Sequence, residues 1–163
     1  MKLFYKPLAC SMAVHIALRE LELPFELIRV ENVEGKLQAA RRDYLDIFPL
    51  GAVPALELED GDIMAEGAVI LEYLAAQAET PSLAPKSGDS DYWTFRQIMN
   101  FIATDIHKNY GPIFHPSVSP EMKQVWLGRL DKRLTYLASI LEKQPYLLAR
   151  GYTIADIYMF VML

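Results

Sequence analysis

The chain has 163 residues, of which 52% are hydrophobic and 23% charged, a composition typical of a globular protein with its own core and not of a disordered one. Residues 1–80 hold 7 basic and 14 acidic side chains and residues 81–163 hold 9 and 7, so neither half has the basic excess of a nucleic-acid-binding protein. No apolar run reaches the roughly 18 residues of a membrane span, and the start MKLFYKP lacks the apolar stretch of a signal peptide, so we expect a cytoplasmic protein.

The first 30 residues predict a strand, a helix and a second strand. KLFY at residues 2–5 is a short apolar strand, SMAVHIALREL at 11–21 has apolar residues at helical spacing, and FELIRV at 25–30 is the second strand. A helix that connects two strands of one sheet makes them parallel. The pattern is weaker from residue 31 to 49, where we expect one irregular helix around residues 38–45.

The next segment predicts a β-hairpin followed by a helix. The strands are residues 53–58 and 63–65, joined by a turn at Asp60 and Gly61, and the helix begins near Glu66. One antiparallel hairpin in an otherwise parallel sheet, in this element order, is typical of a thioredoxin-like domain.

Residues 79–90 contain two prolines and small polar residues, the composition of a linker, and everything from residue 91 to 163 has helical character. Ser119 followed by Pro120 predicts one helix start, and Thr153 with Asp156 predicts a capping box at another. We therefore expect a thioredoxin-like domain at 1–78, a linker at 79–90 and a helical domain at 91–163.

Three features at the predicted loop ends carry chemistry. Cys10, the only cysteine, stands where a strand passes into a helix, which suits either a thiolate stabilised by the helix start or ordinary packing. Val53–Pro54 heads a strand, and its peptide bond is expected to be cis, as in thioredoxin-like folds. Glu66 at a helix start is suited either to receive an ammonium group or to act as a favourable first-turn acid.

With these features in this order, the sequence resembles the cytosolic glutathione transferases, most closely the bacterial beta class. The resemblance rests on MKLFYKPLACSMAVHIALRELELPFELIRVE, GAVPALELEDG, FIATDIHKNYGPIF and PYLLARGYTIADIYMFVML, and it covers essentially the whole chain. It implies a thioredoxin-like glutathione-binding domain followed by a helical domain, that is, a glutathione transferase fold with a short C-terminal part.

The resemblance also implies roles for individual residues. It puts Cys10 and Ser11 beside the glutathione sulfur, with a mixed disulfide at Cys10 as a recurring state, and His107 near the thiol. For glutathione binding it implies the glycyl carboxylate at Lys36, the cysteinyl backbone at Val53 and Pro54, the γ-glutamyl end at Glu66 and Gly67, and further contacts at Asn100 and Asp105. Asp105 is expected to reach the ligand of a partner subunit, which implies a homodimer.

The sequence departs from the family pattern at several positions. Leu8 replaces a usual glycine beside Cys10 and is expected to narrow the approach to the thiol; Val14 replaces a usual proline; and Gly67 replaces a usual serine, which removes a hydroxyl from the γ-glutamyl contact. The chain ends inside what is the buried central helix of the family, so we expect Tyr158, Met159, Phe160 and Leu163 to be partly uncovered. That expectation implies either a truncated chain or cover from another chain.

The expected function is transfer of the glutathione thiol to a hydrophobic electrophile held against Tyr110 and Phe114, with thiol transfer through Cys10 as a second activity. Glutathione is the expected co-substrate, and no metal, nucleic-acid or membrane partner is expected. Two alternatives stay open. The first is a non-catalytic binding or regulatory module, which Leu8, Gly67 and the short C-terminus favour. The second is a glutathione-dependent isomerase, which the missing arginine near Val14 disfavours.

Overall fold

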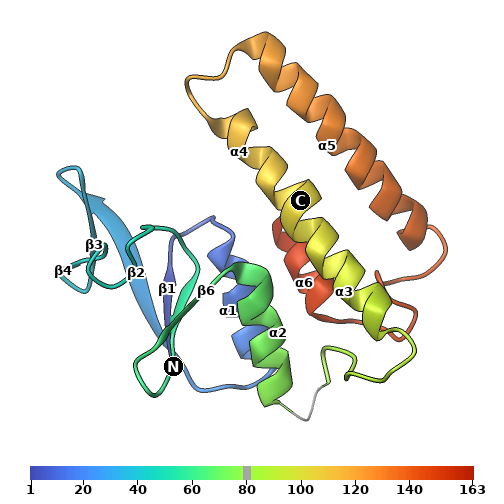
Figure 1. Ribbon diagram of the computed structural model, residues 1–163, viewed down its shortest axis with the longest axis horizontal. Helices are drawn as coiled ribbons and strands as arrows, with labels where there is room; N and C mark the ends of the chain where they lie inside the picture. Colours follow the sequence, from blue (N-terminus) through green and yellow to red (C-terminus); the bar gives the residue numbers. More distant parts are fainter. Residues whose placement is uncertain (79–81) are drawn as a thin grey trace. The chain divides into compact units, whose positions relative to one another are not determined.

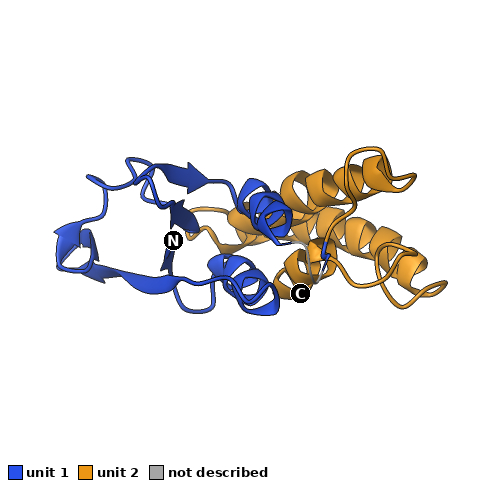
Figure 2. Cartoon of the chain, turned by 90° about the horizontal axis from the view of Figure 1, so that it is seen from below, with its two compact units in different colours: residues 1–83 blue, residues 84–163 orange. Residues whose placement is uncertain are grey.

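The computed structural model describes residues 1–78 and 82–163, and the chain divides into two compact units, Met1–Leu83 and Ala84–Leu163 (Figures 1 and 2). The predicted linker spans this division, and its residues 79–81 lie outside the described part of the chain. The first unit carries a sheet with two helices, and the second is built of helices (Figure 1).

The sheet of the first unit has six strands in the order β4-β3-β2-β1-β5-β6. Only β1 and β2 run parallel, and the other four neighbouring pairs are antiparallel. The sheet is therefore mostly antiparallel, and the expectation of one antiparallel hairpin in an otherwise parallel sheet is wrong. The strands are β1 (Lys2–Tyr5), β2 (Glu26–Val33), β3 (Lys36–Ala39), β4 (Arg42–Asp43), β5 (Ala55–Glu57) and β6 (Ile63–Ala65).

Where a helix around residues 38–45 was expected, the chain instead forms β3 and β4. Two tight turns make this possible, because Glu34 and Gly35 both have positive φ, and so do Ala40 and Arg41. Two successive residues with positive φ form the two-residue turn that suits the twist of a hairpin. Ala40 and Arg41 rarely adopt this conformation, so the residue types gave no signal for the second turn.

Two helices, α1 (Ser11–Glu20) and α2 (Gly67–Gln77), pack against each other, and α1 also packs against β1. Their inward residues, including Ala13, Leu18, Ile70 and Leu74, are almost fully buried. Leu3 on β1 is equally buried, so this helix pair and the central strand share one apolar layer.

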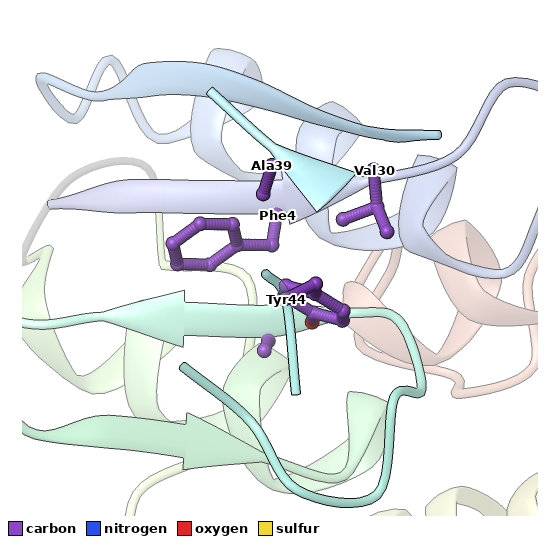
Figure 3. Packing of buried hydrophobic residues seen from close by; sticks show 5 residues of the cluster. Phe4, Val30, Ala39 and Tyr44 are labelled. Atoms are coloured by element: carbon purple, nitrogen blue, oxygen red, sulfur yellow. The ribbon is translucent and has the colours of Figure 1, made fainter. Parts of the chain in front are cut away.

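A second apolar cluster of the first unit forms around Tyr44 and consists of Phe4, Val30, Ala39, Tyr44 and Ala55 (Figure 3). The rings of Phe4 and Tyr44 lie 5.5 Å apart, and the Tyr44 hydroxyl donates to the Ala52 carbonyl at 2.8 Å. Burial raises the pKa of Tyr44 to about 12. This cluster anchors the segment that leads into Val53 and Pro54.

The second unit begins with one continuous helical path of three parts, α3 (Tyr92–Phe101), the π-helix η1 (Ile102–His107) and α4 (Lys108–Phe114). It continues with α5 (Pro120–Leu141) and α6 (Ile154–Val161). Both predicted helix starts are confirmed, because Ser119 accepts from the backbone N–H of Met122 and Thr153 forms a capping box with Asp156. Within the part of the chain that the structure describes, no helix has the length and apolar character needed to cross a membrane.

The last helix is better covered than the sequence suggested. Tyr158 and Met159 are only 3% and 5% exposed because α6 packs against α3 and η1, so the expectation that they are uncovered is wrong. Phe160 and Leu163 are exposed, as expected.

Candidate active site

One end of the sheet gathers the chemistry-bearing residues of the first unit. The register pairs Phe4 of β1 with Ala55 of β5, and Ala55 with Ala65 of β6, so the end of β1, the start of β5 and the end of β6 meet at this end. Cys10 follows β1, Val53 and Pro54 precede β5, and Glu66 follows β6. Cys10 is thereby brought to residues that lie 43 or more positions away in the sequence.

Cys10 lies at the start of α1, and its thiol Sγ donates to the Val53 carbonyl oxygen at 3.1 Å. The Val53–Pro54 peptide bond is cis, as the sequence predicted. The thiol is partly buried and forms no disulfide. Cys10 is therefore held against the backbone that precedes β5 and is not among the buried residues of the apolar core. Its role as a reactive thiol stays a prediction.

Ser11 is fully buried and closes the loop that precedes α1. Its hydroxyl donates to the Lys6 carbonyl and accepts from the Lys6 N–H, both at 3.2 Å. The hydroxyl thus holds the loop that carries Cys10, and its predicted place beside a glutathione sulfur stays a prediction.

Leu8 lies in the same loop with φ of +56° and is 97% exposed. This left-handed conformation costs a residue with a Cβ about 1–2 kcal/mol relative to glycine. The side chain contacts almost nothing, so it does not cover the neighbouring thiol, and the expectation that Leu8 narrows the approach finds no support in this geometry.

Glu66 and Gly67 form the start of α2. Glu66 is the N-cap with φ of +66°, and its carbonyl accepts from the Ile70 N–H at 3.0 Å. The first amides of a helix have no partner within it and present donors and a positive dipole end to an anion. A Cβ added at Gly67 would meet Pro54 Cγ at 3.6 Å, an ordinary contact, so the site has room for a larger residue there.

Lys36 lies at the tip of the β2–β3 hairpin, opposite Val33. Because Arg29 of β2 is level with Tyr5 of β1, the hairpin extends four residues, or about 13 Å, beyond the same end of the sheet that carries Cys10. A shallow depression at this overhang is lined by Lys6, Pro7, Arg29, Val30, Glu31, Asn32, Val33 and Leu37.

The second unit places its predicted site residues along one helical path. Asn100 is an exposed residue of α3, and Asp105 and His107 belong to the π-helix η1. Asp105 accepts from Arg133 of α5 at 3.1 Å, and its carbonyl accepts from the Asn109 side chain. Asp105 is thus engaged within its own unit, and its predicted contact with a partner subunit's ligand stays a prediction.

The His107 ring meets a residue that sequence reasoning missed. Its Nδ1 lies 2.8 Å from the Tyr158 hydroxyl of α6, and the two rings pack edge to face at 5.8 Å. The sequence predicts Tyr158 only as a partly uncovered apolar residue, and no sequence spacing links positions 107 and 158. Only the packing of α6 against η1 reveals the pair.

Tyr110 and Phe114 of α4, the predicted hydrophobic site, stack with their ring centroids 5.9 Å apart and their planes 14° from parallel. The Tyr110 hydroxyl donates to the Met162 carbonyl, and burial raises the pKa of Tyr110. Phe114 is 77% exposed, so the stack presents an aromatic surface to solvent.

Comparison with known proteins gives a consistent result. Residues 9–77 match the model of the glutathione S-transferase N-terminal domain. Glutathione S-transferase GstA of Escherichia coli O157:H7 is 40% identical over 164 residues, which cover all of this chain and 81% of that protein. The chain belongs to the glutathione S-transferase family.

Two solved structures relate the geometry of this transferase to its family. A sphingomonad glutathione S-transferase complexed with glutathione has 36% identity and a TM-score of 0.92, and the match covers 99% of this chain and 80% of that one. A bacterial beta class glutathione S-transferase of Sphingomonas chungbukensis has 35% identity and a TM-score of 0.91 with the same coverage. The predicted family, beta class and glutathione transferase fold are therefore confirmed.

Proposed function

We propose that this glutathione S-transferase binds glutathione at the end of the sheet around Cys10 and conjugates the glutathione thiol to hydrophobic electrophiles. The observation that carries the proposal is the 3.1 Å contact of the Cys10 thiol with the Val53 carbonyl, at the place where the start of α2 also lies. The sphingomonad relative, solved with glutathione, supports glutathione as the co-substrate.

The donors and acceptors at this end of the sheet match the tripeptide. The Val53 carbonyl has two lone pairs and can accept both from Cys10 and from a backbone N–H of glutathione. The amides at the start of α2 suit the γ-glutamyl carboxylate, and the Glu66 carboxylate suits the γ-glutamyl ammonium. Lys36 at the hairpin tip supplies a cation for the glycyl carboxylate.

In the conjugation reaction, the glutathione thiolate attacks the electrophilic carbon of a substrate such as a chloronitrobenzene, the carbon–sulfur bond forms and chloride leaves. The thiol proton passes to solvent. In this proposal Cys10 lies beside the sulfur. The family resemblance assigns His107 to support of the thiolate, and we assign the Tyr110–Phe114 stack to the apolar part of the electrophile.

Thiol transfer is a second proposed activity of Cys10. The Cys10 thiolate attacks the glutathione sulfur of a mixed disulfide, which releases the other thiol and leaves Cys10 bonded to glutathione. A second glutathione thiolate then attacks the glutathione sulfur of that adduct, which releases glutathione disulfide and restores Cys10. A single cysteine in the chain suffices because glutathione supplies the second thiol.

The proposal includes a homodimer in the cytoplasm with a role in detoxification. The family resemblance implies each of these. A sequence with one cysteine cannot form an internal disulfide, which agrees with a reducing compartment such as the cytoplasm. Sedimentation of the purified chain tests the dimer directly.

Replacement of Cys10 separates the two activities. Cys10→Ala removes both the sulfur and the donor to Val53, whereas Cys10→Ser keeps a donor to the same carbonyl and removes only the sulfur. Thiol transfer should be lost in both variants, while conjugation should survive in the serine variant. Calorimetry with reduced glutathione tests binding itself, and no heat at millimolar glutathione would favour the non-catalytic module.

A further inference from the structure

The contact between His107 and Tyr158 joins residues 51 positions apart in the sequence. The Nδ1–hydroxyl distance of 2.8 Å is that of a full hydrogen bond, and the edge-to-face packing at 89° fixes the plane of the imidazole. Tyr158 is 3% exposed, and a buried hydroxyl of this kind requires a partner.

Tyr158 is held rigidly by the ends of its helix. At the start of α6, the Asp156 carboxylate accepts from the Thr153 N–H and hydroxyl and from the Leu147 N–H. Near the end of α6, the Met162 carbonyl accepts from the Tyr110 hydroxyl. The Tyr158 hydroxyl therefore occupies a defined place relative to η1.

His107 is held from its own side as the last residue of the π-helix. Its neighbour Ile106 is fully buried, and Asp105 is tied to Arg133 of α5. The imidazole thus lies on a segment fixed between α5 and α6, with little freedom to turn away from Tyr158.

The direction of the hydrogen bond follows from the chemistry of the two groups. A phenol is a better proton donor than a neutral imidazole, and the unprotonated imidazole nitrogen is the better acceptor. These properties favour donation from the Tyr158 hydroxyl to Nδ1, and in that arrangement the single ring proton of the neutral histidine is on Nε2. The partner of one ring nitrogen sets the state of the other in this way.

We propose that Tyr158 is a positioning residue that fixes His107 as the Nε2–H tautomer. The role of His107 in the reaction rests on the proposed function, whereas its tautomer does not. A donor of fixed orientation stabilises an anion without reorganisation during the reaction.

The tautomer is measurable in the unmodified protein. Long-range proton–nitrogen correlation spectra of the nitrogen-15-labelled chain at mildly alkaline pH should show His107 with a proton on Nε2 and none on Nδ1. A proton on Nδ1 in the wild-type spectrum overturns the proposal without any variant having to fold.

Tyr158→Phe removes the hydroxyl and keeps the ring that packs on His107. In this variant the two His107 tautomers should be mixed, while Tyr44→Phe, which removes another buried hydroxyl in the first unit, should leave His107 unchanged. An unchanged His107 signal in folded Tyr158→Phe refutes the assignment.

Kinetics test the consequence for conjugation. Loss of one oriented hydrogen bond predicts a fall in kcat of up to about tenfold in Tyr158→Phe, with KM for glutathione nearly unchanged. In a His107→Ala background the same substitution should have no further effect on kcat, because Tyr158 acts through that ring. Equal losses in both backgrounds contradict the positioning role. If the wild-type chain has no transferase activity, the proposed function fails while the spectra still decide the tautomer.

Discussion

Serine at position 67 should restore a contact that the sequence lacks. The hydroxyl of Gly67→Ser would lie at the first residue of α2, where the proposed site receives the γ-glutamyl carboxylate. A hydrogen bond to a charged group contributes about 1.5 kcal/mol at the lower end of its range, which corresponds to about tenfold in affinity. We expect the dissociation constant for reduced glutathione to fall by about this factor.

The structure indicates that the substitution is tolerated. The added Cβ would lie 3.6 Å from Pro54 Cγ and 3.9 Å from Pro54 Cδ, both ordinary contacts, and Gly67 does not adopt a positive φ. Gly67→Ala is the matched control because it adds the same Cβ without the hydroxyl, and both variants gain the similar stability that replacing glycine gives a helix.

Isothermal calorimetry of the three proteins with reduced glutathione provides the measurement. Tighter binding in the serine variant alone supports the argument. Equal affinities for the serine and alanine variants would refute it, because the hydroxyl would then make no contact with the ligand.

Three further predictions concern the loop, the pH dependence and the last helix. Leu8→Gly should leave the alkylation rate of Cys10 by iodoacetamide within about twofold, because the leucine is 97% exposed and contributes little to the partial burial of the thiol. Burial and, secondarily, the neighbouring Arg19 lower the pKa of His15. The neutral histidine therefore contributes to stability above pH 6.5, and this contribution is lost as the pH falls through the lowered pKa. In urea unfolding, the free energy of unfolding of His15→Gln should fall less between pH 7.5 and 5 than that of the wild type. Asp156→Ala removes three hydrogen bonds at the start of α6 and should lower the free energy of unfolding by about 2–3 kcal/mol, against no change for the exposed Asp131→Ala.

Each of these has an outcome that contradicts it. Faster alkylation in the glycine variant would mean that Leu8 does restrict the thiol. If the free energy of unfolding of His15→Gln depends on pH as that of the wild type does, His15 does not contribute to the loss of stability at low pH. Equal urea midpoints for the two aspartate variants would show that the capping box contributes little.

Local chemistry made much of the fold predictable. The strand at residues 2–5 and the return strand at 63–65 have the predicted bounds, and the helix starts at Ser119 and Thr153 follow from capping residues whose effect is confined to one turn. The β3–β4 segment was missed because Ala40 and Arg41 adopt a turn that neither residue favours. Such a conformation is imposed by the pairing of the strands and leaves no mark in the sequence.

The candidate site was also predictable only in part. Cys10, Val53 and Glu66 could be selected because each stands at a predicted boundary between elements, where backbone groups are exposed to a ligand. The positive φ of Glu66 and the role of Tyr158 could not, because both depend on contacts between distant segments. The sequence predicts Tyr158 only as a partly uncovered apolar residue, whereas its hydroxyl forms a hydrogen bond with His107.

The π-helix also bears on how the length of this chain can change. Its backbone hydrogen bonds join residues five apart instead of the four of an α-helix. Residues 102–107 therefore hold one residue more than an α-helical segment would at the same place in the helical path. Elsewhere in a helix, removing one residue turns everything beyond it by about 100°. Here a deletion would convert the segment to α-helix while α3 and α4 keep their buried sides. A one-residue deletion in this stretch should thus leave the packing of α3 and α4 in the second unit intact.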